Sequence, residues 1–149
     1  MMTTDSPAPR VVQALSYEQA RVLLDTALAK ASEIGVAASV AVLDAAREVV
    51  AFGRQDRAPL LTGEVAIAKA YTSASLRQPS GALNDAVSPG GPFFGLAHSS
   101  TRGLVTFDGG FVLMVDDEVV GAVGASGGTL EEDALIGSAA VEVFEGWAR

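Results

Sequence analysis

The chain has no cysteine and only one histidine, His98, among its 149 residues. Without cysteine there is no disulfide, no thiolate metal site, no iron–sulfur cluster and no cysteine nucleophile. A zinc site built on two or three histidines of one chain is excluded in the same way. Any imidazole chemistry of a single chain must therefore use His98.

Positive charge is also scarce. Ten Lys and Arg residues oppose eighteen Asp and Glu residues, so the net charge is −8 and the isoelectric point is about 4.5. Nucleic-acid binding depends on basic patches that contact phosphates, and anionic membrane surfaces attract basic segments as well. The composition therefore predicts neither a nucleic acid nor a membrane as partner.

Long apolar runs are missing too, since no run approaches the roughly 20 residues that span a bilayer. The first ten residues, MMTTDSPAPR, lack the apolar core of a secretory signal, so we expect a cytoplasmic protein. Hydrophobic residues nevertheless make up 49% of the chain, and the mean hydropathy is +0.33. We interpret this excess as surface buried between the subunits of a homo-oligomer.

The polar, proline-containing residues 1–15 are expected to form a flexible N-terminal arm, and residues 16–149 a single domain. Apolar residues recur at helical spacing over 16–34, 62–77 and 129–147. The first and last of these segments begin with a capping box, and small residues in the middle one indicate close packing against a neighbour. In the glycine- and proline-rich middle of the chain, Ser80 is expected to cap a short helical turn through Val87.

Five short runs read as strands because they are rich in valine and bounded by turn residues. They are residues 38–43, 49–52, 104–107, 111–115 and 119–125. Hairpin-linked strands with helices segregated from them indicate an antiparallel α+β domain. The expected order is α-β-β-α-(short α)-β-β-β-α.

A glycine-rich stretch, residues 121–129, follows a predicted strand and opens a predicted helix. Free backbone N–H groups at Gly127, Gly128 and Thr129 would suit a carboxylate or phosphate, whereas a tight strand-to-helix turn is the alternative interpretation. The stretch also matches the G-x-S-x-G elbow of hydrolases around Ser126. No histidine follows Ser126, so we reject a hydrolase triad.

Two other residues are candidates for chemistry. His98 lies close to Phe93, and an imidazole beside aromatic side chains suits haem with the histidine as iron ligand; a surface histidine is the alternative. Lys69 is one of only two lysines and has apolar neighbours in its predicted helix. Burial would depress the pKa of Lys69 and favour an acid, base or anion-binding role, while a structural ion pair with an aspartate is the alternative.

A set of short motifs runs along the chain: 40–44 (VAVLD), 49–52 (VVAF), 54–56 (RQD), 68–72 (AKAYT), 91–92, 95–96, 109–110, 120–127 (VGAVGASG) and Asp133. With these motifs the sequence resembles the GlcG/HbpS-like haem-binding family, whose domain also forms the C-terminal part of PduO-type cobalamin adenosyltransferases. The resemblance runs from about Leu15 to Val143 and implies a five-stranded antiparallel sheet that assembles into dimers or larger rings.

The leading hypothesis is a small-molecule-binding protein with haem as the ligand. His98 would hold the iron, Lys69 and the helix start at Gly127, Gly128 and Thr129 would hold the propionates, and Phe93 and Ser126 would complete the site. A second hypothesis is a metal-independent isomerase, lyase or cyclase acting on a small carboxylate or carbonyl compound, with Lys69 or Asp133 moving a proton. A third is an accessory oligomer without a ligand, so the sequence leaves open whether the chain is an enzyme.

Overall fold

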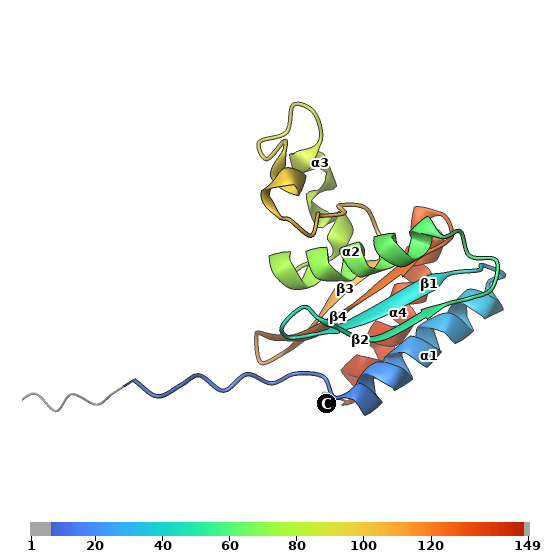
Figure 1. Ribbon diagram of the computed structural model, residues 1–149, viewed down its shortest axis with the longest axis horizontal. Helices are drawn as coiled ribbons and strands as arrows, with labels where there is room; N and C mark the ends of the chain where they lie inside the picture. The colour runs from blue at the N-terminus through green and yellow to red at the C-terminus, as the bar shows by residue number, and fades with distance from the viewer. Residues whose placement is uncertain (1–6, 148–149) are drawn as a thin grey trace, which may run out of the picture.

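The computed structural model describes residues 7–147, which form a four-stranded antiparallel sheet with helices on both of its faces (Figure 1). The expected residues 1–6 of the arm lie outside the described part of the chain. In chain order the elements are α1 (Tyr17–Glu33), β1 (Ser39–Asp44), β2 (Val49–Arg54), α2 (Leu61–Leu76), η1 (Ser80–Leu83), α3 (Asn84–Val87), η2 (Leu96–Ser99), β3 (Gly110–Val115), β4 (Glu118–Ser126) and α4 (Leu130–Trp147).

The strands lie in the order β2-β1-β4-β3, and all neighbours are antiparallel. Two hairpins therefore meet along β1 and β4, where Val42 pairs with Val123. The β3–β4 hairpin turns at Asp116 and Asp117, which adopt positive φ angles of 49° and 61°. Asp tolerates this left-handed conformation better than most residues, which explains why the sequence signals a hairpin there.

The sheet is buried on both faces. Alternate strand residues point to opposite sides, so Val40 and Val42 pack toward α1 and α4, whereas Ala41 and Leu43 pack toward α2. Figure 1 shows α1 and α4 together on one side of the sheet and α2 on the other. On α4, the single tryptophan, Trp147, packs edge-on against Phe144 with ring centroids 6.4 Å apart.

Helix α2 approaches the sheet backbone to backbone, which confirms the close packing indicated by its small residues. A Cβ added at Gly124 of β4 would lie 2.1 Å from the carbonyl oxygen of Ala66. A Cβ at Gly110 of β3 would lie 2.4 Å from the carbonyl oxygen of Lys69. Only glycine fits at these two positions without moving the helix.

The capping boxes expected at the starts of α1 and α4 are present. The Ser16 hydroxyl accepts a hydrogen bond from the Gln19 N–H (3.2 Å), and the Gln19 side chain accepts one from the Ser16 N–H (3.1 Å). Thr129 and Glu132 make the same reciprocal pair at the start of α4. Each pair satisfies two backbone N–H groups that the first helical turn leaves free.

The expected five-stranded sheet is wrong, because residues 104–107 form no strand and the sheet has four. The N–H of Val105 donates to the Thr72 hydroxyl of α2 (2.9 Å) instead of to a neighbouring strand. The expected helical turn is present as η1 and α3, which ends at Val87, but the Ser80 side chain does not cap it. The Ser80 hydroxyl donates to the Phe107 carbonyl (2.7 Å) and accepts from the Gly110 N–H (2.9 Å), so side chains satisfy backbone groups that a strand ladder would otherwise pair.

Between α2 and β3 the chain leaves the body as a protruding segment, residues 78–103, which contains η1, α3 and η2 (Figure 1). At the other end of the chain, Leu15 is buried and its N–H donates to the Val120 carbonyl (3.0 Å). Within residues 7–147, no helix has the length and apolar character needed to cross a membrane.

Candidate functional site

The most deeply buried charge is the ammonium group of Lys69, in the C-terminal half of α2, whose side chain is 0% exposed. Its Nζ donates to the Asp133 carboxylate of α4 (2.7 Å) and to the Ala125 carbonyl of β4 (2.9 Å). The ring of Phe107 lies over it, 5.2 Å from Nζ to the ring centroid. The structure thus brings together Lys69 and Asp133, the two candidate catalytic residues, as a buried ion pair that joins both faces of the sheet.

The glycine-rich turn before α4 is bonded to the protein's own carboxylates. The N–H of Gly128 donates to the second oxygen of Asp133 (2.9 Å), and the N–H of Thr129 donates to Glu132 (2.8 Å). Gly127 has a φ of 153°, and a Cβ there would lie 2.4 Å from the Ala37 carbonyl oxygen. These contacts fit the tight-turn interpretation of this stretch.

Burial lowers the pKa of Lys69, since removing an ammonium group from water disfavours its charged form. The hydrogen bond to Asp133 and the negative charges of Asp133 and Asp108 oppose this effect. The cation and its carboxylate are both enclosed, and each oxygen of the Asp133 carboxylate accepts a hydrogen bond. An ion pair with an aspartate, which the sequence left open as an alternative for Lys69, is thus present.

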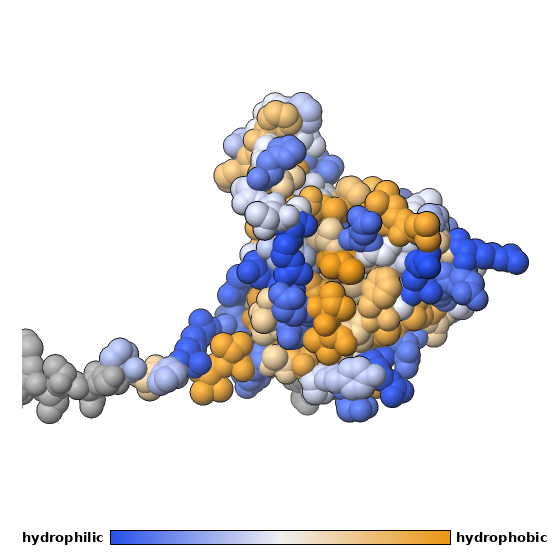
Figure 2. Space-filling model, in the orientation of Figure 1, coloured by the Kyte–Doolittle hydropathy of each residue, from blue (hydrophilic) through white to orange (hydrophobic). Residues whose placement is uncertain are grey.

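His98 lies elsewhere, on η2 in the protruding segment, and is exposed. Phe93 and Phe94, also on that segment, are 56% and 69% exposed. Apolar residues are visible on the surface of this segment in Figure 2. Among the residues that the structure describes, no hydrogen bond or ion pair joins His98 to Lys69.

A second polar cluster, which sequence reasoning missed, surrounds Tyr71. The guanidinium carbons of Arg47 and Arg102 lie 5.0 Å and 4.3 Å from the centroid of its ring. Arg47 also donates to the Tyr71 hydroxyl oxygen (3.4 Å) and to the Ser75 hydroxyl (3.2 Å). The Tyr71 hydroxyl is 3.2 Å from the Ser100 hydroxyl.

This cluster forms one wall of an open pocket of about 440 Å³, which we call the tyrosine pocket. The hydrogen bond from Ser100 and the positive charges of Arg47 and Arg102 lower the pKa of Tyr71 against the opposing effect of burial. The residues that line the pocket are Arg47, Tyr71, Ser75, Leu76, Leu96, Ser99, Ser100, Thr101 and Leu104.

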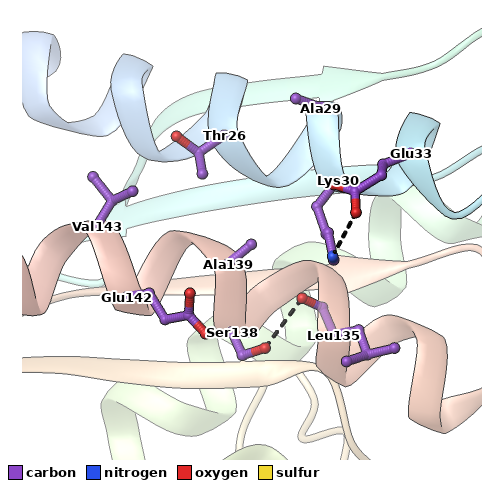
Figure 3. A pocket seen from close by; sticks show the side chains of 9 residues that line it. All are labelled: Thr26, Ala29, Lys30, Glu33, Leu135, Ser138, Ala139, Glu142 and Val143. Carbon is purple, nitrogen blue, oxygen red and sulfur yellow. Dashed lines mark hydrogen bonds and ion pairs between the residues drawn. The ribbon is translucent and has the colours of Figure 1, made fainter.

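A groove of about 550 Å³ lies between α1 and α4 on the opposite layer (Figure 3). Its polar side chains pair locally, since Lys30 bonds Glu33 (3.1 Å) and the Ser138 hydroxyl bonds the Leu135 carbonyl (3.1 Å). Across residues 7–147 no group of three His, Asp or Glu side chains is placed to hold a metal ion.

A four-stranded antiparallel sheet between α1/α4 and α2, crossed by a buried lysine–aspartate pair, defines a small three-layer α+β domain. A family model described as haem degrading protein HbpS-like matches residues 15–142, so the chain belongs to the HbpS-like family. The resemblance seen in the sequence is thereby confirmed.

Known relatives share this domain. The chain is 33% identical over 133 residues to an uncharacterized 15.0 kDa protein in the dhaT-dhaS intergenic region of Citrobacter freundii, covering 89% of this chain and 94% of that protein. The crystal structure of Klebsiella pneumoniae protein ORFY superposes with a TM-score of 0.88 at 30% identity, covering 97% of both chains. The crystal structure of a PduOC:heme complex superposes with a TM-score of 0.82 at 32% identity, covering 87% of this chain and 94% of that one.

Proposed function

We propose that this chain is a small-molecule-binding protein whose ligand is haem, with His98 as the iron ligand. The observation that carries the proposal is the exposure of the single histidine on the same protruding segment as the exposed Phe93 and Phe94. The similarity to PduOC, which was solved as a complex with haem, supports the choice of ligand.

The chemistry of the exposed residues fits a haem group. A neutral imidazole nitrogen is a common axial ligand of haem iron, and the described part of the chain shows no hydrogen bond that occupies the His98 ring. Exposed phenylalanine rings offer the flat apolar contact that a porphyrin face prefers. Bound haem would supply iron-centred redox chemistry, while His98 would hold the iron and Phe93 would cover part of the macrocycle.

The propionate role of Lys69, Gly128 and Thr129 stays a prediction. The Lys69 ammonium already binds Asp133, and the N–H groups of Gly128 and Thr129 already donate to carboxylates of α4. Binding of propionates there would require these bonds to be exchanged. A role for Ser126, which is buried at the end of β4, stays a prediction too.

A haemin titration followed through the Soret band tests the proposal. We expect a saturable, stoichiometric spectrum for the wild-type chain, with loss of that spectrum in His98→Ala and weaker binding in Phe93→Ala. Asn84→Ala is the matched control, because it removes an exposed polar side chain of the same segment without removing an iron ligand. Unchanged affinity and spectrum in His98→Ala would show that the iron ligand is wrongly assigned.

We also propose that the chain forms a homo-oligomer, as expected from its apolar composition. Phe93 and Phe94 on the protruding segment and Leu60 and Leu61 at the start of α2 are large apolar side chains exposed to solvent. Light scattering of the purified protein measures the mass directly, and a monomer at all concentrations would contradict this proposal. A cytoplasmic location stays a prediction from the sequence.

The enzyme hypothesis stays a prediction as well. It requires the Lys69–Asp133 pair to open toward a substrate, and a wild-type rate in Lys69→Met, once a turnover is found, would remove Lys69 from the mechanism. The accessory-oligomer hypothesis predicts that neither haemin nor any small carboxylate raises the melting temperature.

A further inference from the structure

The tyrosine pocket holds a positive charge that no carboxylate of residues 7–147 neutralises by an ion pair. In the part of the chain that the structure describes, no carboxylate lies within ion-pair distance of Arg47. The hydrogen-bond partners of its guanidinium are the uncharged hydroxyls of Tyr71 and Ser75. Arg102, on the same ring, is paired only with Glu48 (3.2 Å) at the surface. The pocket therefore presents guanidinium N–H groups to whatever enters it.

Hydrogen bonds within the protein hold the hairpin turn that carries Arg47. Arg47 has a φ of 66°, a left-handed conformation that is unfavourable for a residue with a Cβ. The Asp44 carboxylate fixes the turn by accepting hydrogen bonds from the N–H groups of Ala46 (2.8 Å) and Glu48 (3.1 Å).

The remaining walls of the pocket divide into two kinds of surface. The lining residues that carry hydroxyl groups are Tyr71, Ser75, Ser99, Ser100 and Thr101. Three leucines, Leu76, Leu96 and Leu104, form the apolar part. A volume of about 440 Å³ falls within the range of small-molecule sites. A ligand that fills such a pocket needs an anionic end for the arginine and hydroxyls and an apolar body for the leucines.

We propose that the tyrosine pocket binds the carboxylate group of a small organic acid with an apolar body. The planar guanidinium of Arg47 bonds the carboxylate oxygens, the hydroxyls of Ser75 and Ser100 bond the same group, and the leucines contact the body. This proposal does not rest on haem binding, since His98 is not among the lining residues. The carboxylate could belong to a free acid or to a haem propionate, and the experiment separates these two sources.

Calorimetric titration of the purified full-length chain with hexanoate tests the proposal. We expect saturable binding of hexanoate, no binding of the neutral hexanamide, and affinity for hexanoate reduced about tenfold or more in Arg47→Gln, as expected for loss of a charged hydrogen-bond partner. Arg47→Lys keeps the positive charge but loses the planar pair of N–H donors, so its hexanoate affinity should lie between those of the wild-type chain and Arg47→Gln. Arg21→Gln is the matched control, because Arg21 is an exposed arginine of α1 on the opposite layer.

A second readout guards against a variant that merely misfolds. A carboxylate bound at Arg47 adds negative charge beside Tyr71 and should raise the pKa of its phenol, which is followed by phenolate absorbance in a Tyr17→Phe background. Equal hexanoate affinity in Arg47→Gln and Arg21→Gln would overturn the proposal. An unchanged pKa of Tyr71 in the presence of millimolar hexanoate or benzoate would overturn it as well.

Haemin titration of the same variants identifies the source of the carboxylate. If the Arg47→Gln variant loses hexanoate binding but keeps wild-type haemin affinity, the pocket takes a free acid. If the same variant also weakens haemin binding while His98→Ala leaves hexanoate binding intact, the pocket additionally accepts a propionate. Failure of haemin to bind at all would contradict the haem proposal alone.

Discussion

Two polar clusters lie on the same helix, and they differ in how completely the protein satisfies them. Lys69 and Tyr71 are two positions apart in α2, which corresponds to a rotation of about 200° around the helix axis, so their side chains leave on nearly opposite sides. Lys69 finds a carboxylate, a carbonyl and an aromatic ring inside the protein. Arg47, beside Tyr71, finds only hydroxyls and the ring, in a pocket open to solvent.

The difference separates a structural role from a binding role. A buried charge without its partner is expensive, so we expect the Lys69–Asp133 pair to contribute to the stability of the domain. A solvated charge without a partner costs little in the free protein and is available to an incoming anion. Chemical reactivity of the residue type alone would have ranked Lys69 first, whereas the geometry points to Arg47 and Tyr71.

The largest expected effect comes from breaking the closed cluster. Asp133→Ala leaves the Lys69 ammonium buried without a carboxylate, and we expect it to lower the free energy of unfolding by about 3–5 kcal/mol. Urea denaturation followed by circular dichroism measures the loss. Glu131→Ala, which removes an exposed carboxylate from the same helical turn, is the control and should have a small effect.

Removal of both charges should restore part of that stability. The double variant Lys69→Met, Asp133→Asn leaves no buried charge and retains an oxygen for the Gly128 N–H. We expect it to be more stable than Asp133→Ala. A double variant that is as unstable as Asp133→Ala would show that packing, rather than charge, holds this region together.

The second effect tests how closely α2 must lie on the sheet to keep Lys69 enclosed. Gly124→Ala places a Cβ against the Ala66 carbonyl, and we expect a loss of about 1–3 kcal/mol in the free energy of unfolding from overpacking. Gly146→Ala is the control, since a Cβ there meets no atom within 4 Å. Thermal melts compare the two, and equal melting temperatures would contradict the backbone-to-backbone contact.

The third effect is a dependence of stability on pH at the alkaline end. Burial lowers the pKa of Lys69 in the folded chain below its usual 10.5. At a pH between the lowered pKa and 10.5, the unfolded chain therefore holds a proton that the folded chain has released. The pKa of Tyr71 is lowered from 10.0, and its phenol loses its proton earlier in the folded chain in the same way. In both cases the unfolded state binds more protons, so the free energy of unfolding rises with pH over these windows.

Two variants separate the contributions of the two clusters to this rise of the free energy of unfolding with pH. Lys69→Met should remove the contribution of the buried pair, and Tyr71→Phe should remove the contribution of the pocket. Urea denaturation midpoints measured from neutral to alkaline pH give both slopes. A fall in stability over this range in the wild-type chain, relative to Lys69→Met, would contradict the direction assigned to Lys69.

The smallest effect is expected at the surface of the pocket. Arg102→Gln breaks the ion pair with Glu48, whose side chain is 70% exposed, and we expect a change below about 1 kcal/mol in the free energy of unfolding. The pKa of Tyr71 should nevertheless rise, because one of its two neighbouring cations is lost. A spectrophotometric titration in the Tyr17→Phe background measures it.

The sequence predicted the three long helices and four of the strands, because hydrophobic periodicity and capping residues are local signals. It failed at residues 104–107, since a short apolar run gives no sign that the Val105 N–H binds Thr72 of α2. Strand pairing depends on which distant groups are available, and those are fixed only in the fold.

The candidate site shows the same limit. Lys69 and Asp133 were each singled out, but their meeting across 64 positions depends on the layers of the fold. Arg47 and Tyr71 were not singled out, because an arginine in a turn and a tyrosine in a helix are ordinary by themselves. Their 24-residue separation becomes a contact only when the first hairpin lies beside α2.

The contact between Trp147 and Phe144 has a practical consequence for spectroscopy. The chain has a single tryptophan, and it lies at the end of α4, on the opposite side of the sheet from Tyr71. Indole emission therefore reports on one layer of the molecule, while phenolate absorption at Tyr71 reports on the other. In the Tyr17→Phe background, where Tyr71 is the remaining tyrosine, indole emission from one layer and phenolate absorption from the other can be recorded in a single sample without any added label.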